Sequence, residues 1–202
     1  GAPAQRFHRA AILPGMVLAF GVGGFATFNA FVPDHSTTVG LGGSKWVFLT
    51  YSVVCLVVRI FGARLPERLG LARSVSTALV LQGAGLFTLA AIATPAGVYA
   101  GAAVIGLGTA FMYPALMAMT VNRVPEHERA RVISTFTMFF EVGVAGGALL
   151  FGLVAEFTGK RGGFLGGGIS ALVGLWFLWR VLLPALRSRP ISASEGEVVT
   201  AH

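Results

Sequence analysis

Charged residues and cysteines are scarce in this chain. Charged residues make up 11% of its 202 residues, hydrophobic residues make up 55%, and Cys55 is its one cysteine. Soluble domains carry about 25% charged residues, because their surface has to be polar. The composition therefore excludes a soluble enzyme and a disordered tail, and a single cysteine excludes an internally disulfide-bonded scaffold. It predicts an integral membrane protein, whose 28 glycines indicate closely packed helices.

Patterns for metal, nucleotide and nucleic-acid binding are missing as well. The sequence has no zinc-ligand spacing, no Walker loop and no strand–glycine-rich turn–helix unit. Its histidines all lie outside the apolar runs, which disfavours an intramembrane serine protease; they are His8, His35, His127 and His202. The net charge of +7 comes from short basic clusters between apolar runs, so it indicates membrane orientation rather than nucleic-acid binding. We expect no enzyme activity, no cofactor, no metal and no nucleic-acid partner.

Long runs without charge predict an all-α integral membrane protein with six transmembrane helices. Residues 10–32 would form a helix of about 34 Å, enough to cross a bilayer core of about 30 Å. Residues 74–122 carry no charge but are too long for one span, and the turn residues 94–97 divide them. The predicted helices lie near residues 10–32, 44–63, 75–93, 98–121, 132–155 and 162–183. They form one bundle over residues 1–190, and the polar residues 191–202 are expected to form a disordered tail.

The basic residues are distributed unequally between the two sides of this predicted bundle. Six spans place both termini on one side, and 12 of the 15 Lys and Arg residues lie on that side. The other side has Lys45, Lys160 and Arg161. Since short cytoplasmic loops are enriched in Lys and Arg, we expect a multi-pass protein of the cell membrane with both termini of this chain in the cytoplasm.

A short pattern recurs at a spacing that indicates an internal repeat. Glu67 stands three residues before Gly70, Glu156 stands three residues before Gly159, and the two acids are 89 residues apart. The first and fourth predicted helices begin 88 residues apart, near residues 10 and 98. The six helices therefore form two three-helix units, and because three is odd the second unit is inverted in the membrane.

These features resemble the major facilitator superfamily, specifically its C-terminal six-helix half. The family motif between the second and third helices reads Gly-x-x-x-Asp-Arg-x-Gly-Arg-Lys or similar, and Glu67, Arg68 and Gly70 occupy its acid, arginine and glycine positions. Ala63 replaces the leading glycine, and glutamate replaces aspartate. Residues 123–131 also resemble the family's loop into its eleventh helix. The resemblance covers about residues 6–184 and implies an N-terminal six-helix half as the missing partner.

Glu141 is the sharpest candidate for a functional side chain. It lies ten residues after Arg131, or about 15 Å into a predicted span. An ionised carboxylate there costs about 2.5–3.5 kcal/mol, so Glu141 should be protonated, paired or in contact with water. Ser134 and Thr137 share its helical face. Glu141 is either a proton-coupling or substrate-binding group, or a neutral side chain that joins two helices by a hydrogen bond.

Further candidates follow from the resemblance. In the family the first, second, fourth and fifth helices of this half line a cavity, which places Asn29, Tyr51 and Tyr113 with Glu141 and Thr137; each of the first three also has a structural interpretation. Gln82 lies on an outer helix and is expected to bond another helix, and Gly143 with Gly147 forms a GxxxG packing pair. The predicted cytoplasmic gate consists of Glu67, Arg68, Gly70 and Arg73, although membrane anchoring alone would account for its arginines.

Together these observations predict a secondary active transporter, or its C-terminal half, that works by alternating access. No nucleotide motif is present, so the energy would come from an ion gradient, with protons carried through Glu141. The expected partners are membrane lipid and a small organic solute. Because the cavity lining is apolar and has few charges, we expect the solute to be an amphipathic compound that is exported. The alternatives are a non-transport six-helix membrane scaffold and an uptake symporter of the same fold.

Overall fold

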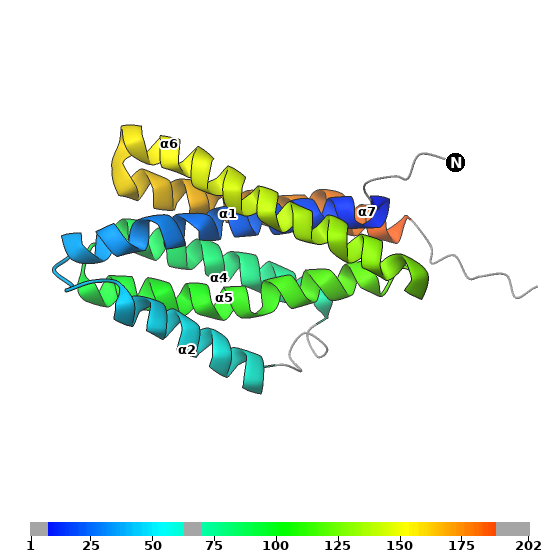
Figure 1. Ribbon diagram of the computed structural model, residues 1–202, viewed down its shortest axis with the longest axis horizontal. Coiled ribbons are helices and arrows are strands. Elements are labelled where there is room, and N and C mark those ends of the chain that lie inside the picture. Colours follow the sequence, from blue (N-terminus) through cyan, green and yellow to red (C-terminus); the bar gives the residue numbers. More distant parts are fainter. Residues whose placement is uncertain (1–7, 63–69, 189–202) are drawn as a thin grey trace, which may run out of the picture.

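The computed structural model describes residues 8–62 and 70–188, and every element in these two ranges is a helix. The axes of the long helices run roughly along the long dimension of the molecule (Figure 1). The helices are α1 (Arg9–Thr38), α2 (Lys45–Phe61), α4 (Leu71–Ala91), α5 (Pro95–Val121), the 3-10 turn η1 (Glu126–Glu128), α6 (Arg129–Phe177), the π-helical η2 (Leu178–Leu182) and α7 (Leu183–Arg187).

The longest helix, α6, doubles back on itself at Gly159. This residue has φ 74° and ψ 177°, a conformation that only glycine adopts readily. The first leg of α6 (residues 129–158) and the second leg (residues 160–177, continued by η2 and α7) run in opposite directions from this reversal (Figure 1). A Cβ atom added at Gly166 would lie 2.7 Å from the ring of Phe151, so the two legs are in contact near the reversal. The legs occupy the places of the predicted helices 132–155 and 162–183.

The helices confirm the all-α part of the prediction, and their length and hydropathy agree with a membrane protein. Within the described ranges, four helical runs are long and apolar enough to cross a membrane: α1, α4, α5 and the continuous run Glu126–Arg187. That last run contains the reversal at Gly159, and α2 has 17 residues. The number of six spans and the inverted repeat remain predictions.

The three largest differences from the predicted helix boundaries lie at the end of α1, the start of α4 and the end of the last helix. α1 continues through Pro33 to Thr38, where the hydroxyls of Thr37 and Thr38 both donate to Asp34 O, so a proline near its end did not stop the helix. α4 begins at Leu71, directly after Gly70. The last helix passes Pro184 by way of the π turn, in which Leu183 N–H donates to Leu178 O. Residues 191–202, the predicted tail, lie outside the described ranges.

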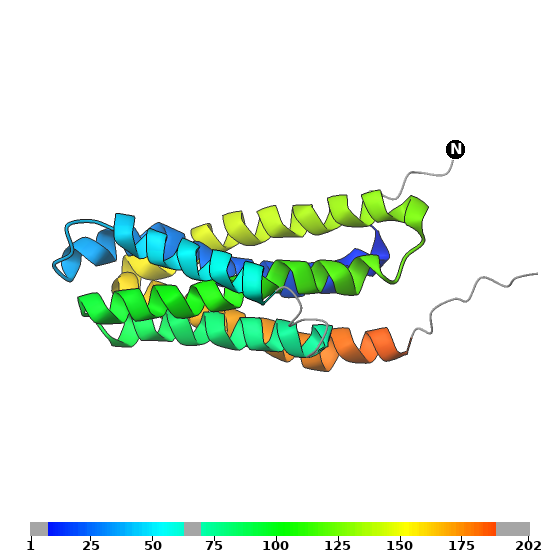
Figure 2. The same cartoon turned by 90° about the horizontal axis from the view of Figure 1, so that it is seen from below.

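The helices are arranged around α1. α1 packs against both legs of α6, while α5 packs against α4 on one side and α2 on the other. Figure 2 shows α4 and the second leg of α6 together on one side of the bundle and the first leg on the opposite side. α4 and the second leg therefore lie on the side of the bundle opposite the first leg, which carries the predicted site residues Thr137 and Glu141.

Glycines make the contact between α1 and α6 close. A Cβ atom at Gly143 would lie 2.7 Å from the Cα of Ala19, and one at Gly147 would meet the backbone of Gly23. The predicted packing role of this pair is therefore confirmed. The predicted interhelical bond of Gln82 is confirmed too, because its buried Nε2 donates to Gly21 O across the α4–α1 contact.

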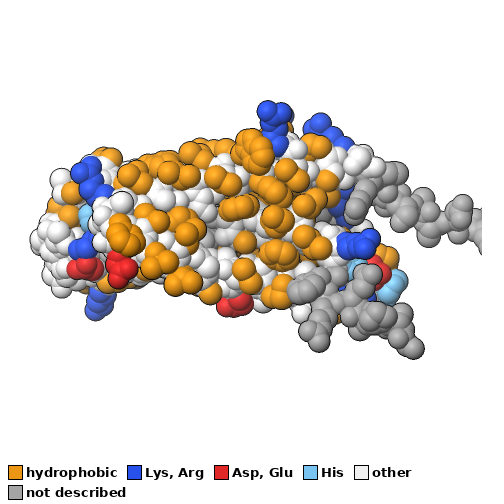
Figure 3. Space-filling view, turned by 90° about the horizontal axis from the view of Figure 1, so that it is seen from above, with side chains coloured by type: hydrophobic (Ala, Val, Ile, Leu, Met, Phe, Trp, Pro, Cys, Tyr) orange, Lys and Arg blue, Asp and Glu red, His pale blue; other side chains and the backbone are white. Residues whose placement is uncertain are grey.

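Apolar side chains cover the middle of the bundle, and most charged side chains lie near its two ends (Figure 3). We call the end where α1 begins and α7 ends the terminal end, and the other the loop end. Among the described residues the loop end has Lys45, Lys160 and Arg161. The described basic residues at the terminal end are Arg9, Arg73, Arg123, Arg129, Arg131, Arg180 and Arg187. Arg59 lies in the last turn of α2, which stops well short of that end in Figure 1.

Candidate functional site

The first leg of α6 has a polar stripe on the side that faces away from the rest of the chain. Ser134, Thr137 and Glu141 are exposed, whereas Gly143 and Gly147 on the opposite side are buried against α1. Glu141 is the thirteenth residue of a leg that spans residues 129–158, so it lies near the middle of the predicted membrane thickness. The stripe therefore places a carboxyl group at mid-depth on a surface that this chain leaves uncovered.

Lipid is a poor environment for this carboxyl group. An ionised carboxylate at the bilayer centre costs about 2.5–3.5 kcal/mol on insertion scales. Glu141 has no hydrogen bond or ion pair with another side chain among the residues that the structure describes. Since its own chain does not cover it, the carboxyl group requires water, a proton or a partner on that side.

Tyr113 lies next to this stripe. It is half-buried on α5, and its ring centroid is 5.4 Å from that of Phe136 and 6.1 Å from that of Phe140, both on the first leg of α6. Both contacts are edge-to-face, a favourable geometry for aromatic rings. The structure therefore groups Tyr113 with the leg that carries Thr137 and Glu141.

Asn29 and Tyr51 form a second group nearer the loop end. Tyr51 on α2 packs its ring 5.4 Å from Phe25 and 5.3 Å from Phe28 of α1, measured between centroids. Asn29 follows Phe28 and is exposed. The five predicted site residues thus lie on the four helices α1, α2, α5 and the first leg of α6, in two groups.

The predicted gate is described in part. Gly70 caps the N-terminus of α4 with φ 83° and ψ 144°, and Arg73 is exposed in the first turn. Gly159 has a closely similar conformation, with φ 74° and ψ 177°, so the two glycines of the predicted repeat share a backbone geometry. Glu67 and Arg68 lie outside the described residues.

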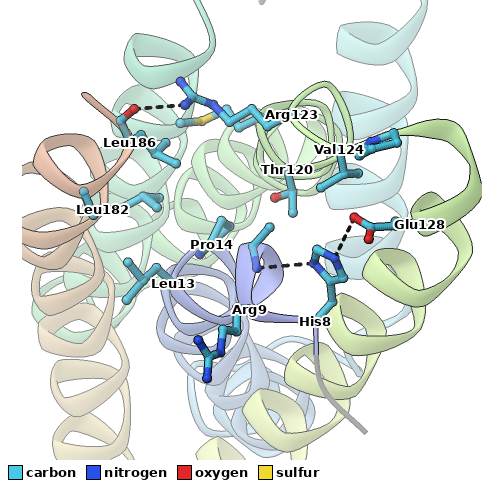
Figure 4. Close-up of a pocket in the computed structure, with 14 residues that line it drawn as sticks. His8, Arg9, Leu13, Pro14, Thr120, Arg123, Val124, Glu128, Leu182 and Leu186 are labelled. Atoms are coloured by element: carbon cyan, nitrogen blue, oxygen red, sulfur yellow. Dashed lines mark hydrogen bonds and ion pairs between the residues drawn. The ribbon is translucent and has the colours of Figure 1, made fainter. Parts of the chain in front are cut away.

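The hydrogen bonds that His8 makes at the terminal end (Figure 4) were not predicted from the sequence. His8 Nδ1 accepts a hydrogen bond from Ala10 N–H at 3.3 Å, so Nε2 carries the hydrogen and donates to Glu128 Oε2 at 3.1 Å. His8 N–H also donates to Thr135 Oγ1 at 3.0 Å. These bonds tie the start of α1 to the start of α6. The partners are 120 and 127 residues apart, so no local pattern could have shown the pairing.

Two of the basic residues at the loop end have structural partners. Lys160 Nζ lies 2.6 Å from Asp34 Oδ2 and donates to Thr38 Oγ1 at 2.8 Å. Arg161 Nε donates to Ala90 O at 2.7 Å. The turn of α6 is thereby fastened to the ends of α1 and α4, which gives these cations a role other than orientation.

Metal binding finds no support in the described ranges, where no three His, Cys, Asp or Glu side chains gather closely enough to hold an ion. The candidate site is instead a mid-depth carboxyl group with hydroxyl and aromatic neighbours on membrane helices. Such sites bind and move solutes or protons.

Comparison with known proteins identifies the family of this helical membrane protein. The model of the Major Facilitator Superfamily matches residues 9–202. The chain belongs to this superfamily and is a multi-pass membrane protein, which confirms the resemblance described above.

Its curated relatives carry transporter names. An uncharacterized MFS-type transporter of Salmonella typhimurium is 28% identical over 161 residues, which cover 80% of this chain and 42% of that protein. One of Pseudomonas aeruginosa is 29% identical over 161 residues, with 80% and 40% covered. The uncharacterized MFS-type transporter YhhS of Salmonella enteritidis is 26% identical over 184 residues, with 90% and 44% covered. The chain thus spans about two-fifths of the length of these relatives.

Proposed function

We propose that this protein acts as a secondary active transporter, or as the C-terminal half of one, that exports a small organic solute in exchange for protons. The observation that carries the proposal is the exposed Glu141 at mid-depth on the first leg of α6. A scaffold has no use for an uncovered carboxyl group there, because it costs free energy in lipid. A transporter uses such a group where two halves enclose a solute site at the midplane.

The proposed coupling follows from the chemistry of a carboxyl group. Glu141 is neutral while its surroundings are dry and ionises when water reaches it. Rocking this bundle against an N-terminal half would expose Glu141 to each side in turn and so move a proton. The relatives are more than twice as long as the region that matches this chain, which is long enough to include such an N-terminal half.

The residues grouped around Glu141 indicate the class of solute. Thr137 offers a hydroxyl on the same stripe, and Tyr113 packs between α5 and that leg. Asn29 and Tyr51, near the aromatic rings of Phe25 and Phe28, complete the proposed lining. Few charges and several rings suit an amphipathic organic compound rather than a highly charged metabolite.

Replacing Glu141 with glutamine tests the proposal. Full-length protein in proteoliposomes would be given a pH gradient and rhodamine 6G as the amphipathic probe. We expect Glu141→Gln to fold normally, to lose at least ten-fold in gradient-driven accumulation of the dye and to retain dye exchange, because glutamine cannot carry a proton. Glu156→Gln makes the same change on an exposed residue near the end of the same leg and should leave both activities intact.

Two results would count against the proposal. Driven accumulation that survives in Glu141→Gln would show that Glu141 is a structural hydrogen-bonding group. Failure of the unaltered protein to move the dye at all would contradict export of amphipathic compounds.

We further propose that Glu67, Arg68, Gly70 and Arg73 form a cytoplasmic gate. Its support is the motif spacing together with the glycine-specific conformation of Gly70 ahead of α4. Glu67→Gln should lower transport several-fold at normal membrane expression, because a carboxylate–arginine pair loses charge assistance. Full transport by this variant in the same proteoliposomes would leave the loop as an orientation signal.

The orientation that this gate requires has the terminal end in the cytoplasm, as the excess of arginine there favours. With Cys55 replaced by alanine, a membrane-impermeant maleimide on intact cells should label a cysteine at the exposed Gly42 and spare one at the exposed His127. The reverse labelling would invert the assignment.

A further inference from the structure

The loop end of the bundle contains a buried histidine that the proposed transport site does not use. His35 lies in the last turn of α1, beyond the predicted span of residues 10–32, and 5% of its surface is exposed. Its ring packs edge-to-face on Phe164 of the second leg of α6, with the centroids 5.3 Å apart. Among the described residues its buried Nε2 has no hydrogen-bond partner. Buried polar groups in folded proteins nearly always have a partner, so this one calls for an explanation.

The contacts that fasten the turn of α6 lie next to this histidine. We call these contacts the loop-end lock: Lys160 Nζ with Asp34 Oδ2 at 2.6 Å and Thr38 Oγ1 at 2.8 Å, and Arg161 Nε with Ala90 O at 2.7 Å. Asp34 precedes His35 in the chain, and Lys160 lies one turn before Phe164. His35 is therefore placed where the end of α1 meets the turn of α6.

The charged groups that act on the His35 ring are Lys160 and Asp34. Burial, together with the Lys160 ammonium, lowers the pKa of His35, whereas the Asp34 carboxylate raises it. Because Asp34 is already paired with Lys160, the closed lock offers an imidazolium no free carboxylate. The other described charged side chains near this end are Lys45, Glu156 and Arg161. The closed lock therefore favours neutral His35.

We propose that the loop end is an acid-sensitive lock: neutral His35 holds the end of α1 against the turn of α6, and protonation of His35 releases that contact. An imidazolium packed on Phe164 beside Lys160 loses its hydration and meets a like charge. When α1 and the turn separate, water reaches the ring, which then takes up a proton at its ordinary value of about 6.5. The closed lock is thus most stable above about pH 6.5 and weakens as the pH falls below it. The proposal depends neither on Glu141 nor on the direction of transport.

Hydrogen exchange of the full-length protein, measured by mass spectrometry in detergent, can test the lock. Exchange rates at pH 7.5 and pH 5.0 would be corrected for the intrinsic effect of pH on amide exchange. Protection of the amides in residues 33–40 and 160–166 should fall at least five-fold at pH 5.0. His35→Gln cannot take up this proton and should remove the fall. His127→Gln makes the same change at an exposed histidine of the terminal end and should keep it.

A second variant tests the same lock with His35 in place. Lys160→Gln removes the cation beside His35 and frees the Asp34 carboxylate to stabilise an imidazolium, so the loss of protection should begin at a higher pH than in the unaltered protein. This variant decides the question if His35→Gln does not fold. The proposal is overturned by protection that does not change with pH, by the same fall in His35→Gln, or by an unchanged pH dependence in Lys160→Gln.

Discussion

Two faces of the first leg of α6 differ in the residues they carry and in what surrounds them. Gly143 and Gly147 face α1, where a methyl group would meet the backbone of Ala19 or Gly23. Thr137 and Glu141 face the other way and touch little of this chain. The first face minimises the distance between helices, whereas the second leaves polar groups uncovered at a depth where lipid penalises them.

The comparison shows how one helix can combine a face that packs on its neighbour with a polar face that is left free for the proposed solute site. Close contact on the glycine face fixes the leg on α1, so the direction of the polar face is set by backbone packing. A residue on the first face should therefore affect stability, and a residue on the second should affect transport with little effect on stability.

The largest expected effect is on the glycine face. Gly147→Ala places a methyl group against the backbone of Gly23 and should lower the free energy of unfolding by about 1–3 kcal/mol, with loss of folded protein in the membrane. Gly146→Ala is the control, because a Cβ atom there meets nothing within 4 Å and alanine favours a helix by up to about 1 kcal/mol. Thermal unfolding in detergent would measure both, and equal stability of the two variants would contradict the difference between the faces.

A second experiment asks whether the polar face meets water. In the full-length protein without Cys55, a cysteine at Thr137 should react with a water-soluble methanethiosulfonate at least ten-fold faster than one at Val142. Both positions are exposed in this chain, but Val142 lies about 100° around the helix from Glu141. The measurement is the labelling rate in membranes. Similar rates at the two positions would mean that the polar stripe does not line an aqueous cavity.

The smallest expected effect separates two threonines on the same leg. Thr135 is buried and accepts the hydrogen bond from His8 N–H, so Thr135→Val should cost about 1 kcal/mol of stability and leave solute affinity unchanged. Thr137→Val should keep stability and weaken solute binding two- to five-fold. Unfolding and dye-binding measurements on both variants would show whether Thr135→Val changes only stability and Thr137→Val changes only binding. A loss of stability in Thr137→Val would remove Thr137 from the proposed site.

Much of the architecture could be predicted because a membrane imposes strong local rules. The apolar runs predicted the helices, and Thr94 with Pro95 predicted the break between α4 and α5. The spacing of Gly143 and Gly147 predicted a packing face. Helix ends were harder to place, since Pro33 and Pro184 both lie within helical runs. The effect of each proline depends on the neighbouring turns, such as the π turn before Pro184, which no local sequence pattern predicted.

The candidate site was predicted less completely than the fold. Glu141 could be singled out because a charge inside an apolar run is visible from the sequence alone. The pairing of His8 with Glu128 and of Asp34 with Lys160 joins residues from distant parts of the chain. None of these has a local signature.

The sequence by itself determined that this is a helical membrane protein with glycine-rich contacts and a carboxyl group at mid-depth, because hydropathy and spacing act over a few turns of one helix. Only the tertiary structure decided which face of the first leg of α6 packs on α1 and which stays uncovered. It also decided that Tyr113 lies with this leg while Tyr51 packs on α1. The physical reason is that burial and ring contacts depend on how helices approach one another in space, and side chains far apart in the chain set that approach.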